Sequence, residues 1–198
     1  MPDLLSLGFD TSAAHCAAAL VLGDRLLALH QEDMARGQAE RLFPLLEELL
    51  ADNGKLWADL DVIGVGTGPG NFTGIRIAVA AARGLSLSLG IPAIGIGVTE
   101  AAAYGLPRPC RVTVPARGDE VFFQDFGLEP AQALPLQAPI HDLPPGPAIL
   151  PPVMHRAEAI ARLARDRRDA PNLPRPAPIY LRPADAAPAR DRGPVILT

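Results

Sequence analysis

The sequence predicts a mixed α/β protein built in two parts, and three observations support this. Short apolar segments separated by turn residues open the chain. Helical and strand-like patterns then alternate as far as residue 106. Beyond that point proline becomes frequent, because 4 of the 22 prolines fall in residues 1–106 and the other 18 in residues 107–198. We therefore expect an N-terminal unit, residues 1–106, and a smaller Pro-rich unit with a tail, residues 107–198.

The opening segments predict three antiparallel strands, at residues 4–9, 17–22 and 26–30. An amphipathic helix should follow and end near Asn53-Gly54, with Pro44 in its first turn or at a kink. Its apolar positions have helical spacing and are Leu42, Phe43, Leu46, Leu49 and Leu50.

The rest of the first part alternates strands and helices. Strands are expected at 62–65 and 92–96, and helices at 73–88 and 99–104. A meander of three strands followed by helix, strand, helix and strand is the order of a ribonuclease-H-like lobe, the building block of actin-like folds. The first part should therefore be such a lobe, with a mixed sheet.

The second part predicts less regular structure. Residues 111–114 and 120–126 should form a hairpin, and residues 156–168 a helix that turns Ile160, Leu163 and Ala164 inward. After Pro171 the chain should be extended, because prolines remove backbone donors.

Composition excludes several classes of protein. The 198 residues carry a formal net charge of −4 and are only 5% aromatic, which is unlike a protein that stacks single-stranded nucleic acid. No apolar run approaches the roughly 18 residues that span a bilayer, and Asp3 stands where a secretory signal would carry positive charge. We expect a cytoplasmic protein without a membrane partner. Cys16 and Cys110 form no metal-binding or disulfide pattern and should be buried.

One loop pair is a candidate anion or nucleotide site. Asp10, Thr11 and Ser12 end the first strand, where actin-like folds present a carboxylate and hydroxyls to phosphate or its metal. A glycine-rich loop at 66–74 could add backbone N–H groups at a helix N-terminus, and its candidate residues are Gly68, Gly70, Asn71 and Thr73. The alternative is structural, since a hairpin turn and an Asn71 or Thr73 N-cap would explain the same residues.

Other chemistries lack their motifs. The chain has no Gly-Lys-Ser/Thr triplet and no Gly-x-Ser-x-Gly sequence. The histidines at 15, 30, 141 and 155 have no helical pairing that would hold a metal. The arginines of the 156–168 helix could contact RNA phosphates, but a solvated helix face is the favoured interpretation.

Several motifs together resemble the TsaB (YeaZ) family of bacterial tRNA threonylcarbamoyladenosine biosynthesis proteins. They cover residues 4–104 densely and thin out to 116–122 and 178–182. The most specific stretch is Gly-Pro-Gly-x-Phe-Thr-Gly-x-Arg at residues 68–76. The other matching segments are Phe9-Asp10-Thr11-Ser12, residues 35–42, Ala82-Arg83-Gly84-Leu85, and Gly90-Ile91-Pro92 with Glu100.

The resemblance implies an actin-like (ASKHA) fold with a reduced second lobe. It also implies a noncatalytic scaffold that binds the enzyme TsaD, with the ATPase TsaE as a further partner, for threonylcarbamoyl transfer to adenosine 37 of tRNA. ATP would be used by the complex, tRNA contacted only indirectly, and no cofactor held by this chain alone. Val98 and Ala102 stand where the related enzyme has its two metal-binding histidines, which disfavours the alternative of a metallopeptidase. The alternative of a small-molecule kinase would need a deep cleft and a catalytic Asp, for which Asp10 is the only candidate.

The resemblance places the partner surface, for TsaD or a second copy of the chain, on residues 35–50 and on the helix after Gly74. Gln38 and Asn71 depart from the family pattern, which usually has His and Ser there. The alternative is that the leucines of the first helix all belong to the core. The expected partner-binding residues are Arg36, Gln38, Glu40, Arg41, Leu42, Leu46, Leu49 and Arg76.

Overall fold

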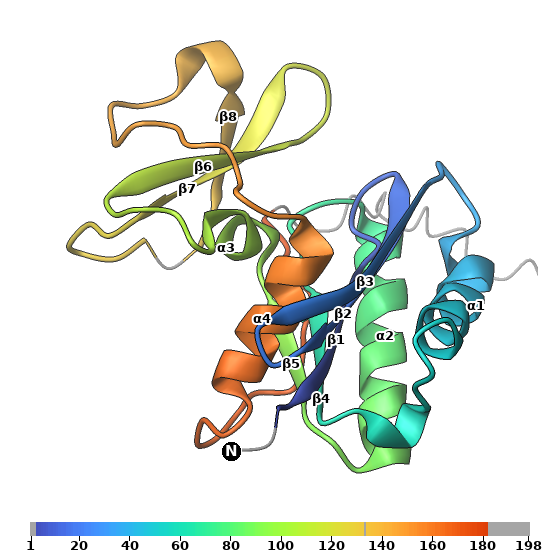
Figure 1. Cartoon of the computed structure of the whole chain (residues 1–198). Helices are drawn as coiled ribbons and strands as arrows, with labels where there is room; N and C mark the ends of the chain where they lie inside the picture. Colours follow the sequence, from blue (N-terminus) through green and yellow to red (C-terminus); the bar gives the residue numbers. More distant parts are fainter. Residues whose placement is uncertain (1–2, 133, 182–198) are drawn as a thin grey trace, which may run out of the picture.

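The protein contains two β-sheets with helices packed around the larger one, as the computed structural model shows (Figure 1). The structure describes residues 3–132 and 134–181. The first sheet contains β1 (Leu5–Asp10), β2 (His15–Leu22), β3 (Arg25–Asp33), β4 (Val62–Gly66) and β5 (Ala93–Ile96). The second contains β6 (Cys110–Pro115), β7 (Glu120–Phe126) and β8 (Leu136–Pro139). The α-helices are α1 (Gln38–Ala51), α2 (Phe72–Leu89), α3 (Val98–Ala103) and α4 (Arg156–Arg167).

The larger sheet has the mixed topology that the sequence predicts. Its strand order is β3-β2-β1-β4-β5, in which β1, β2 and β3 are antiparallel neighbours. β4 runs parallel to β1, and β5 runs parallel to β4 after the crossover through α2. This arrangement confirms the predicted ribonuclease-H-like lobe and the actin-like fold class.

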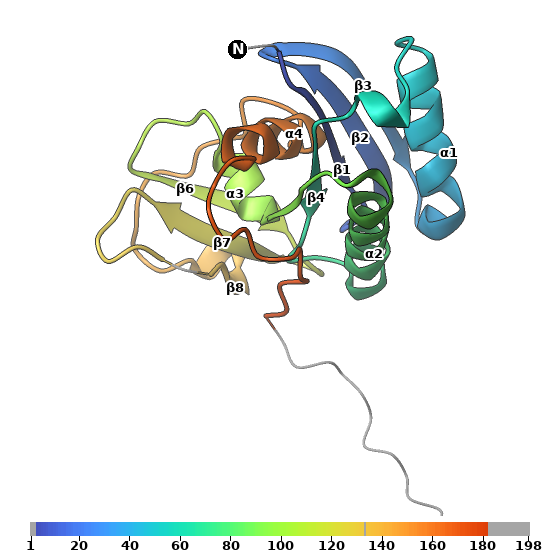
Figure 2. The same ribbon diagram turned by 90° about the horizontal axis from the view of Figure 1, so that it is seen from below.

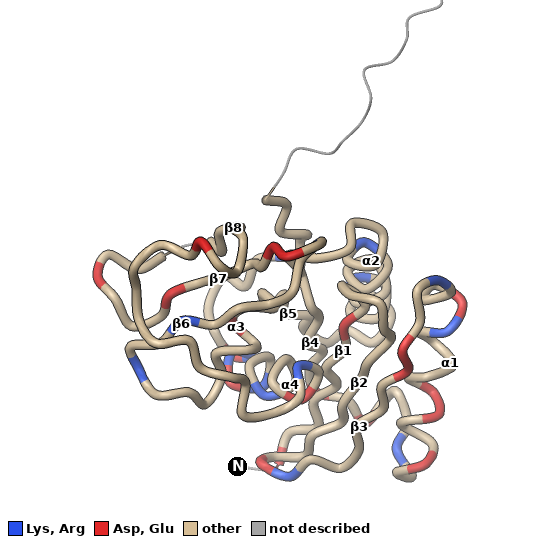
Figure 3. The backbone as a smooth tube through the Cα atoms, turned by 90° about the horizontal axis from the view of Figure 1, so that it is seen from above, with Lys and Arg blue, Asp and Glu red and all other residues tan. Residues whose placement is uncertain are grey.

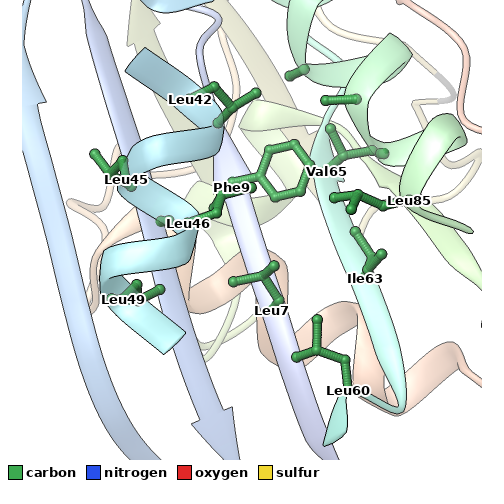
Figure 4. Close-up of a cluster of buried hydrophobic side chains, with 14 of the residues drawn as sticks. Leu7, Phe9, Leu42, Leu45, Leu46, Leu49, Leu60, Ile63, Val65 and Leu85 are labelled. Atoms are coloured by element: carbon green, nitrogen blue, oxygen red, sulfur yellow. The ribbon is translucent and has the colours of Figure 1, made fainter. Parts of the chain in front are cut away.

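One face of this sheet is covered by α1 and α2, and large side chains fill the space between them. Alternate residues of β1 point to this face, so Leu7 and Phe9 meet the inner side of α1 (Figure 4). α2 contributes Ala78, Ala82 and Leu85 to the same cluster. The prediction that no segment is long and apolar enough to span a bilayer is wrong for α2, which has the length and composition of a membrane-spanning helix. In this structure α2 packs against the sheet, and one side of it is buried in the core.

The opposite face is covered by α4, a helix from the second half of the chain (Figure 2). Here the packing surfaces are small. A side chain at Gly8 would collide with the backbone of Ala157 and Ala161, and one at Gly64 would lie 2.6 Å from the Ile160 carbonyl oxygen. The predicted boundary at residue 106 therefore separates the strands of the two sheets along the sequence. It does not separate two independent folding units, since α4 follows the boundary but packs on the first sheet.

The second sheet, with order β6-β7-β8, forms the smaller lobe together with α3. The predicted hairpin is confirmed as β6 and β7, whereas β8 has no clear sequence signal. A buried ion pair stabilises this lobe: Arg111 Nε donates to Asp125 at 2.5 Å, and Arg111 Nη1 donates to the carbonyl oxygen of Pro144. Arg111 thereby holds the proline-rich loop against the sheet.

Two helix details decide between alternatives that the sequence leaves open. Pro44 lies inside α1, beyond its first turn, so the hydrogen bond that its nitrogen would donate is missing. At the start of α2, Asn71 is the N-cap, because its side chain accepts a hydrogen bond from Gly74 N at 3.0 Å. Residues after Pro171 form no regular helix or strand as far as Leu181, as predicted.

Candidate functional site

Asp10 lies at the end of β1, under α4, and is completely buried. Its carboxylate accepts four hydrogen bonds, from Ser12 N, Ser12 Oγ, His15 Nε2 and Arg156 Nη1, at 2.9 to 3.1 Å. Burial alone would raise the pKa of Asp10, but the hydrogen bond from His15 and the charge of Arg156 outweigh it and hold the pKa well below its usual range. Asp10 is therefore a charged, fully bonded group.

Thr11 and Ser12 pack directly against the glycine-rich loop. Thr11 Oγ1 donates to the carbonyl oxygen of Gly74 at 2.6 Å, and Asn71 N donates to the carbonyl oxygen of Ser12 at 2.6 Å. Side chains at Gly70 or Gly74 would collide with the same two backbone segments, so these glycines permit close approach of the two loops.

These contacts change the expected role of the loop pair. Asp10, Thr11 and Ser12 are at most 2% exposed, and their side-chain oxygens bond within the protein. Asn71 caps α2 instead of facing an anion, whereas Thr73 and Gly70 lie at the surface. The Asp10 side of the predicted anion site is thus closed in this structure, and a ligand would have to displace Arg156 or Ser12 from the carboxylate.

The sequence did not single out the groups that close this junction. His155 is the N-cap of α4: its Nδ1 accepts from Ala157 N at 3.1 Å, and its Nε2 is 2.7 Å from Gln31 Oε1. Burial, together with the nearby His15 and Arg156, lowers the pKa of His155. His15 and Arg156 come from β2 and α4, 141 positions apart, so only the fold brings them to Asp10.

α3 carries Val98 and Ala102, the two positions that the family resemblance matches to metal-binding histidines. Val98 is 0% exposed and Ala102 is 6% exposed, and both pack in the apolar cluster between α3 and β6. Within residues 3–132 and 134–181, no group of three or more His, Cys, Asp or Glu side chains has the geometry of a metal site. Glu100, between these two positions, forms an ion pair with Arg167 of α4.

The outer surface of α1 and α2 is different, because apolar groups reach the solvent there. A groove of about 390 Å³ runs between the two helices, and we call it the α1/α2 groove. Phe43 lies on its edge and is 42% exposed, while Gly84 on α2 has open space around it. The groove is lined by Ala39, Leu42, Phe43, Ile77, Ala80, Ala81 and Gly84.

The leucines expected at a partner surface lie mostly elsewhere. Leu46 and Leu49 are fully buried and Leu42 is 1% exposed, so all three belong to the core, and only Leu42 also borders the groove (Figure 4). The expectation that Leu46 or Leu49 faces outward is wrong. The helix turns these residues toward the sheet, and Phe43 is the apolar side chain that it leaves at the surface.

The polar residues expected at a partner surface separate into two groups. Gln38 is nearly buried and donates to the carbonyl oxygen of Met34, and Arg41 is held between Glu32 and Glu48. Arg36, Glu40 and Arg76 are exposed. Of the polar residues predicted to bind a partner, these three are therefore the ones at the surface.

The arginines of α4 are already neutralised by carboxylates. Arg162 pairs with Glu158, Arg165 with Asp24 and Asp166, and Arg167 with Glu100. Together with the Arg156–Asp10 pair, these contacts favour the interpretation of a structural helix over a surface for RNA phosphates.

A model of the family described as TsaD, tRNA N6-adenosine threonylcarbamoyltransferase, matches residues 29–129, which is more than half of the chain. The chain belongs to the TsaD family. Two solved structures narrow this likeness. An uncharacterized protein with similarity to peptidase YeaZ from Pseudomonas aeruginosa is 26% identical, with a TM-score of 0.71. YeaZ from Pseudomonas aeruginosa is 27% identical, with a TM-score of 0.67.

Each alignment covers 90% of this chain and 100% of the Pseudomonas chain, so the smaller second lobe is included in the match. No curated protein matches the sequence. The structural matches confirm the predicted likeness to TsaB (YeaZ) and relate this TsaD-family chain to tRNA modification.

Proposed function

We propose that this chain is a noncatalytic subunit that binds a TsaD protein through the α1/α2 groove and is required for threonylcarbamoyl transfer to adenosine 37 of tRNA. The observation that carries the proposal is the groove itself. Its apolar lining lies at the surface, with Phe43 at one edge and the small residues Ala80 and Gly84 along the other. Small residues let another helix approach closely, which suits a helical partner surface.

The charges beside the groove also suit a partner with a similar pair of helices. On α1, Glu40 and Glu47 are exposed and lie about one turn before and after Phe43, while the charged residues of α2 are Arg76 and Arg83. Figure 3 shows acidic positions along α1 and basic positions along α2. A partner that sets its own α2-like helix against α1 would pair opposite charges at both edges. Such pairs fix orientation more than affinity. A second copy of this chain could dock in the same way when TsaD is absent.

A noncatalytic role is supported by what occupies the related enzyme's functional positions. Metallopeptidase chemistry would need ligands where Val98 and Ala102 are buried in apolar packing. A kinase would need a carboxylate free to act on its substrate, whereas Asp10 is enclosed by Arg156, His15 and Ser12. We therefore assign the chemistry to TsaD, and the use of ATP to the complex with TsaE.

Contact with tRNA would then be made by the partner. The basic helix α4 directs Arg162, Arg165 and Arg167 to acidic groups of its own chain. The complex would act in the cytoplasm, where its tRNA substrate is.

Filling the groove tests the proposal. Gly84 is exposed, and a Cβ added there would meet no atom within 4 Å, so the side chain of Gly84→Trp can leave the helix toward solvent and should leave the fold intact. It should weaken binding to the TsaD protein of the same genome by at least about tenfold, since a bulky group prevents close helix approach. Titration calorimetry measures the affinity, and mass spectrometry of tRNA digests measures threonylcarbamoyladenosine in a reconstituted reaction.

Ala131→Trp is the matched control, because residue 131 is exposed on the second lobe, away from both helices. This variant should bind TsaD and support modification like the unchanged protein. Equal binding by the Gly84→Trp variant, or no binding of TsaD by the unchanged chain, would contradict the proposal.

A further inference from the structure

A cluster of three side chains lies beside the α1/α2 groove, at the N-terminal end of α2. The guanidinium carbon of Arg76 is 3.7 Å from the ring centroid of Phe72 and 5.7 Å from that of Tyr180. The two rings are 5.1 Å apart, and Arg76 Nε donates to the Tyr180 hydroxyl at 2.8 Å. We call Phe72, Arg76 and Tyr180 the Arg76 cluster.

Tyr180 reaches this position on an extended segment, residues 174–181, that is fixed to the first lobe. Ile179 N donates to the carbonyl oxygen of Thr67 at 2.8 Å, and Arg83 Nε donates to the carbonyl oxygen of Pro176 at 2.8 Å. The side chain of Ile179 packs beside Gly97. The segment is therefore held at three points, and Tyr180 is positioned before any partner arrives.

The Arg76 cluster combines exposure with a fixed geometry. Phe72 is 40% exposed and Tyr180 is 44% exposed, although both are large aromatic side chains. The terminal nitrogens of Arg76 make no hydrogen bond or ion pair with the part of the chain that the structure describes. An arginine whose Nε and plane are fixed, and whose Nη atoms are free, is preorganised to receive a carboxylate.

The cluster is continuous with the groove. Arg76 precedes Ile77 of the groove lining, and Ala80 lies one turn further along the same flank of α2. A partner helix seated in the groove would pass within reach of the guanidinium. Arginine and aromatic side chains are also the residues that most often dominate binding energy at protein interfaces.

We propose that the Arg76 cluster is a preassembled binding site for a carboxylate side chain of the TsaD partner, and that Tyr180 is a positioning residue that holds the guanidinium for it. This inference rests on the proposed function and deepens it, because it names a second contact outside the groove and the chemistry of the group that it takes. It also assigns the segment 174–181 to the partner surface.

Four variants test the inference by titration with TsaD. Arg76→Glu reverses the charge and should weaken binding by about thirtyfold or more at low salt, with a smaller loss at high salt. Arg76→Lys keeps the charge but loses the planar donor pair, so binding should weaken by about tenfold. Tyr180→Phe retains the ring and loses only the hydrogen bond to Nε. Tyr180→Ala should weaken binding by about fivefold, more than Tyr180→Phe does, because the guanidinium is no longer held in place.

A double variant distinguishes positioning from a merely structural role. If Tyr180 acts through Arg76, Tyr180→Ala should cause no further loss of affinity in an Arg76→Glu background. Arg25→Glu is the charge control, since Arg25 is exposed on the edge strand β3. Circular dichroism melting checks that every variant is folded.

The outcomes separate this inference from the proposed function. Loss of binding in Gly84→Trp but not in Arg76→Glu, relative to Arg25→Glu, would overturn the inference and leave the proposed function standing. Independent, additive effects of Tyr180→Ala and Arg76→Glu would overturn the positioning role. Failure of the unchanged chain to bind TsaD would overturn both proposals.

Discussion

The two helical layers on the larger sheet pack against it through different kinds of residue. On the α1/α2 side, large residues such as Leu7, Phe9 and Leu46 fill the space between helix and strand (Figure 4). On the α4 side, glycine and alanine bring the helix close to the strands, and hydrogen bonds to Asp10 connect the two.

The outer surfaces of the layers differ in the same way. The arginines of α4 bond to carboxylates of their own chain, so the helix presents few unsatisfied groups. α2 carries Arg76 and Arg83, which bond to uncharged oxygens, beside an apolar groove. The difference indicates that α4 completes the fold, whereas α1 and α2 serve both the core and a partner.

The largest expected effect is the difference between a charged substitution on the core side of α1 and one on its outer side. Leu46→Asp places a carboxylate in the apolar core and should prevent folding, since a buried unpaired charge costs more than the stability of a typical domain can bear. Phe43→Asp, three residues earlier, should leave the fold intact and abolish binding to TsaD. Circular dichroism and titration calorimetry measure the two effects.

Both substitutions lie on one helix, so the two variants compare its core side and its outer side directly. A folded Leu46→Asp protein would mean that the α1/α2 layer tolerates polar groups as the α4 layer does. Unchanged TsaD binding by the Phe43→Asp protein would remove the exposed apolar edge from the partner surface.

The next effect concerns the polar junction beneath α4. Asp10→Ala leaves Arg156 and His15 without their carboxylate and should lower the free energy of unfolding by about 3–5 kcal/mol. Because the pKa of Asp10 is lowered in the folded state, its stabilising effect is present above the ordinary value of 3.8 and is lost as the pH falls below it. Urea denaturation across this pH range gives the measurement. A loss under about 1 kcal/mol would show that the junction does not hold α4 in place.

A smaller effect should appear at mildly acidic pH. The lowered pKa of His155 means that its contribution to stability is present above 6.5 and is lost as the pH falls from that value toward the folded-state pKa. Protonation would put a hydrogen on Nδ1, which accepts the capping bond from Ala157. His155→Asn retains a capping acceptor that does not titrate.

The variant should therefore lose less stability than the unchanged protein between about pH 7.5 and about pH 5.5. Parallel urea titrations at both pH values provide the comparison. Identical losses in the two proteins would show that the cap on α4 is not sensitive to His155 protonation, and the unchanged protein serves as its own control at the higher pH.

Much of the fold follows from local patterns. The five strands of the first sheet and the helices α1, α2 and α4 are predicted within a few residues, because their periodicity and turn residues are strong. The placement of α4 is not predicted. Gly8 and Gly64 interrupt two strands, which indicates that another backbone approaches the sheet closely at these points. The sequence does not show which helix it is.

The candidate site was harder to predict, for a related reason. A single helix does not reveal which of its apolar residues face inward. Leu46 and Leu49 are predicted among the partner-binding residues, whereas both are buried and Phe43 is exposed. Asp10 was expected to face a ligand because its neutralising partner, Arg156, comes from the other end of the chain. Contacts between distant segments leave no local pattern to recognise.

The close approach of α4 to Gly8 also has a consequence for how the chain is made. β1 ends at Asp10, but the helix that covers its second face begins only at Arg156. At ordinary rates of translation, on the order of 10 seconds pass between the synthesis of these two segments. During that interval the nascent first lobe carries an uncovered face with Asp10 lacking its guanidinium. We therefore expect the growing chain to expose surface that favours aggregation, and slowing translation before residue 156 should increase its aggregation.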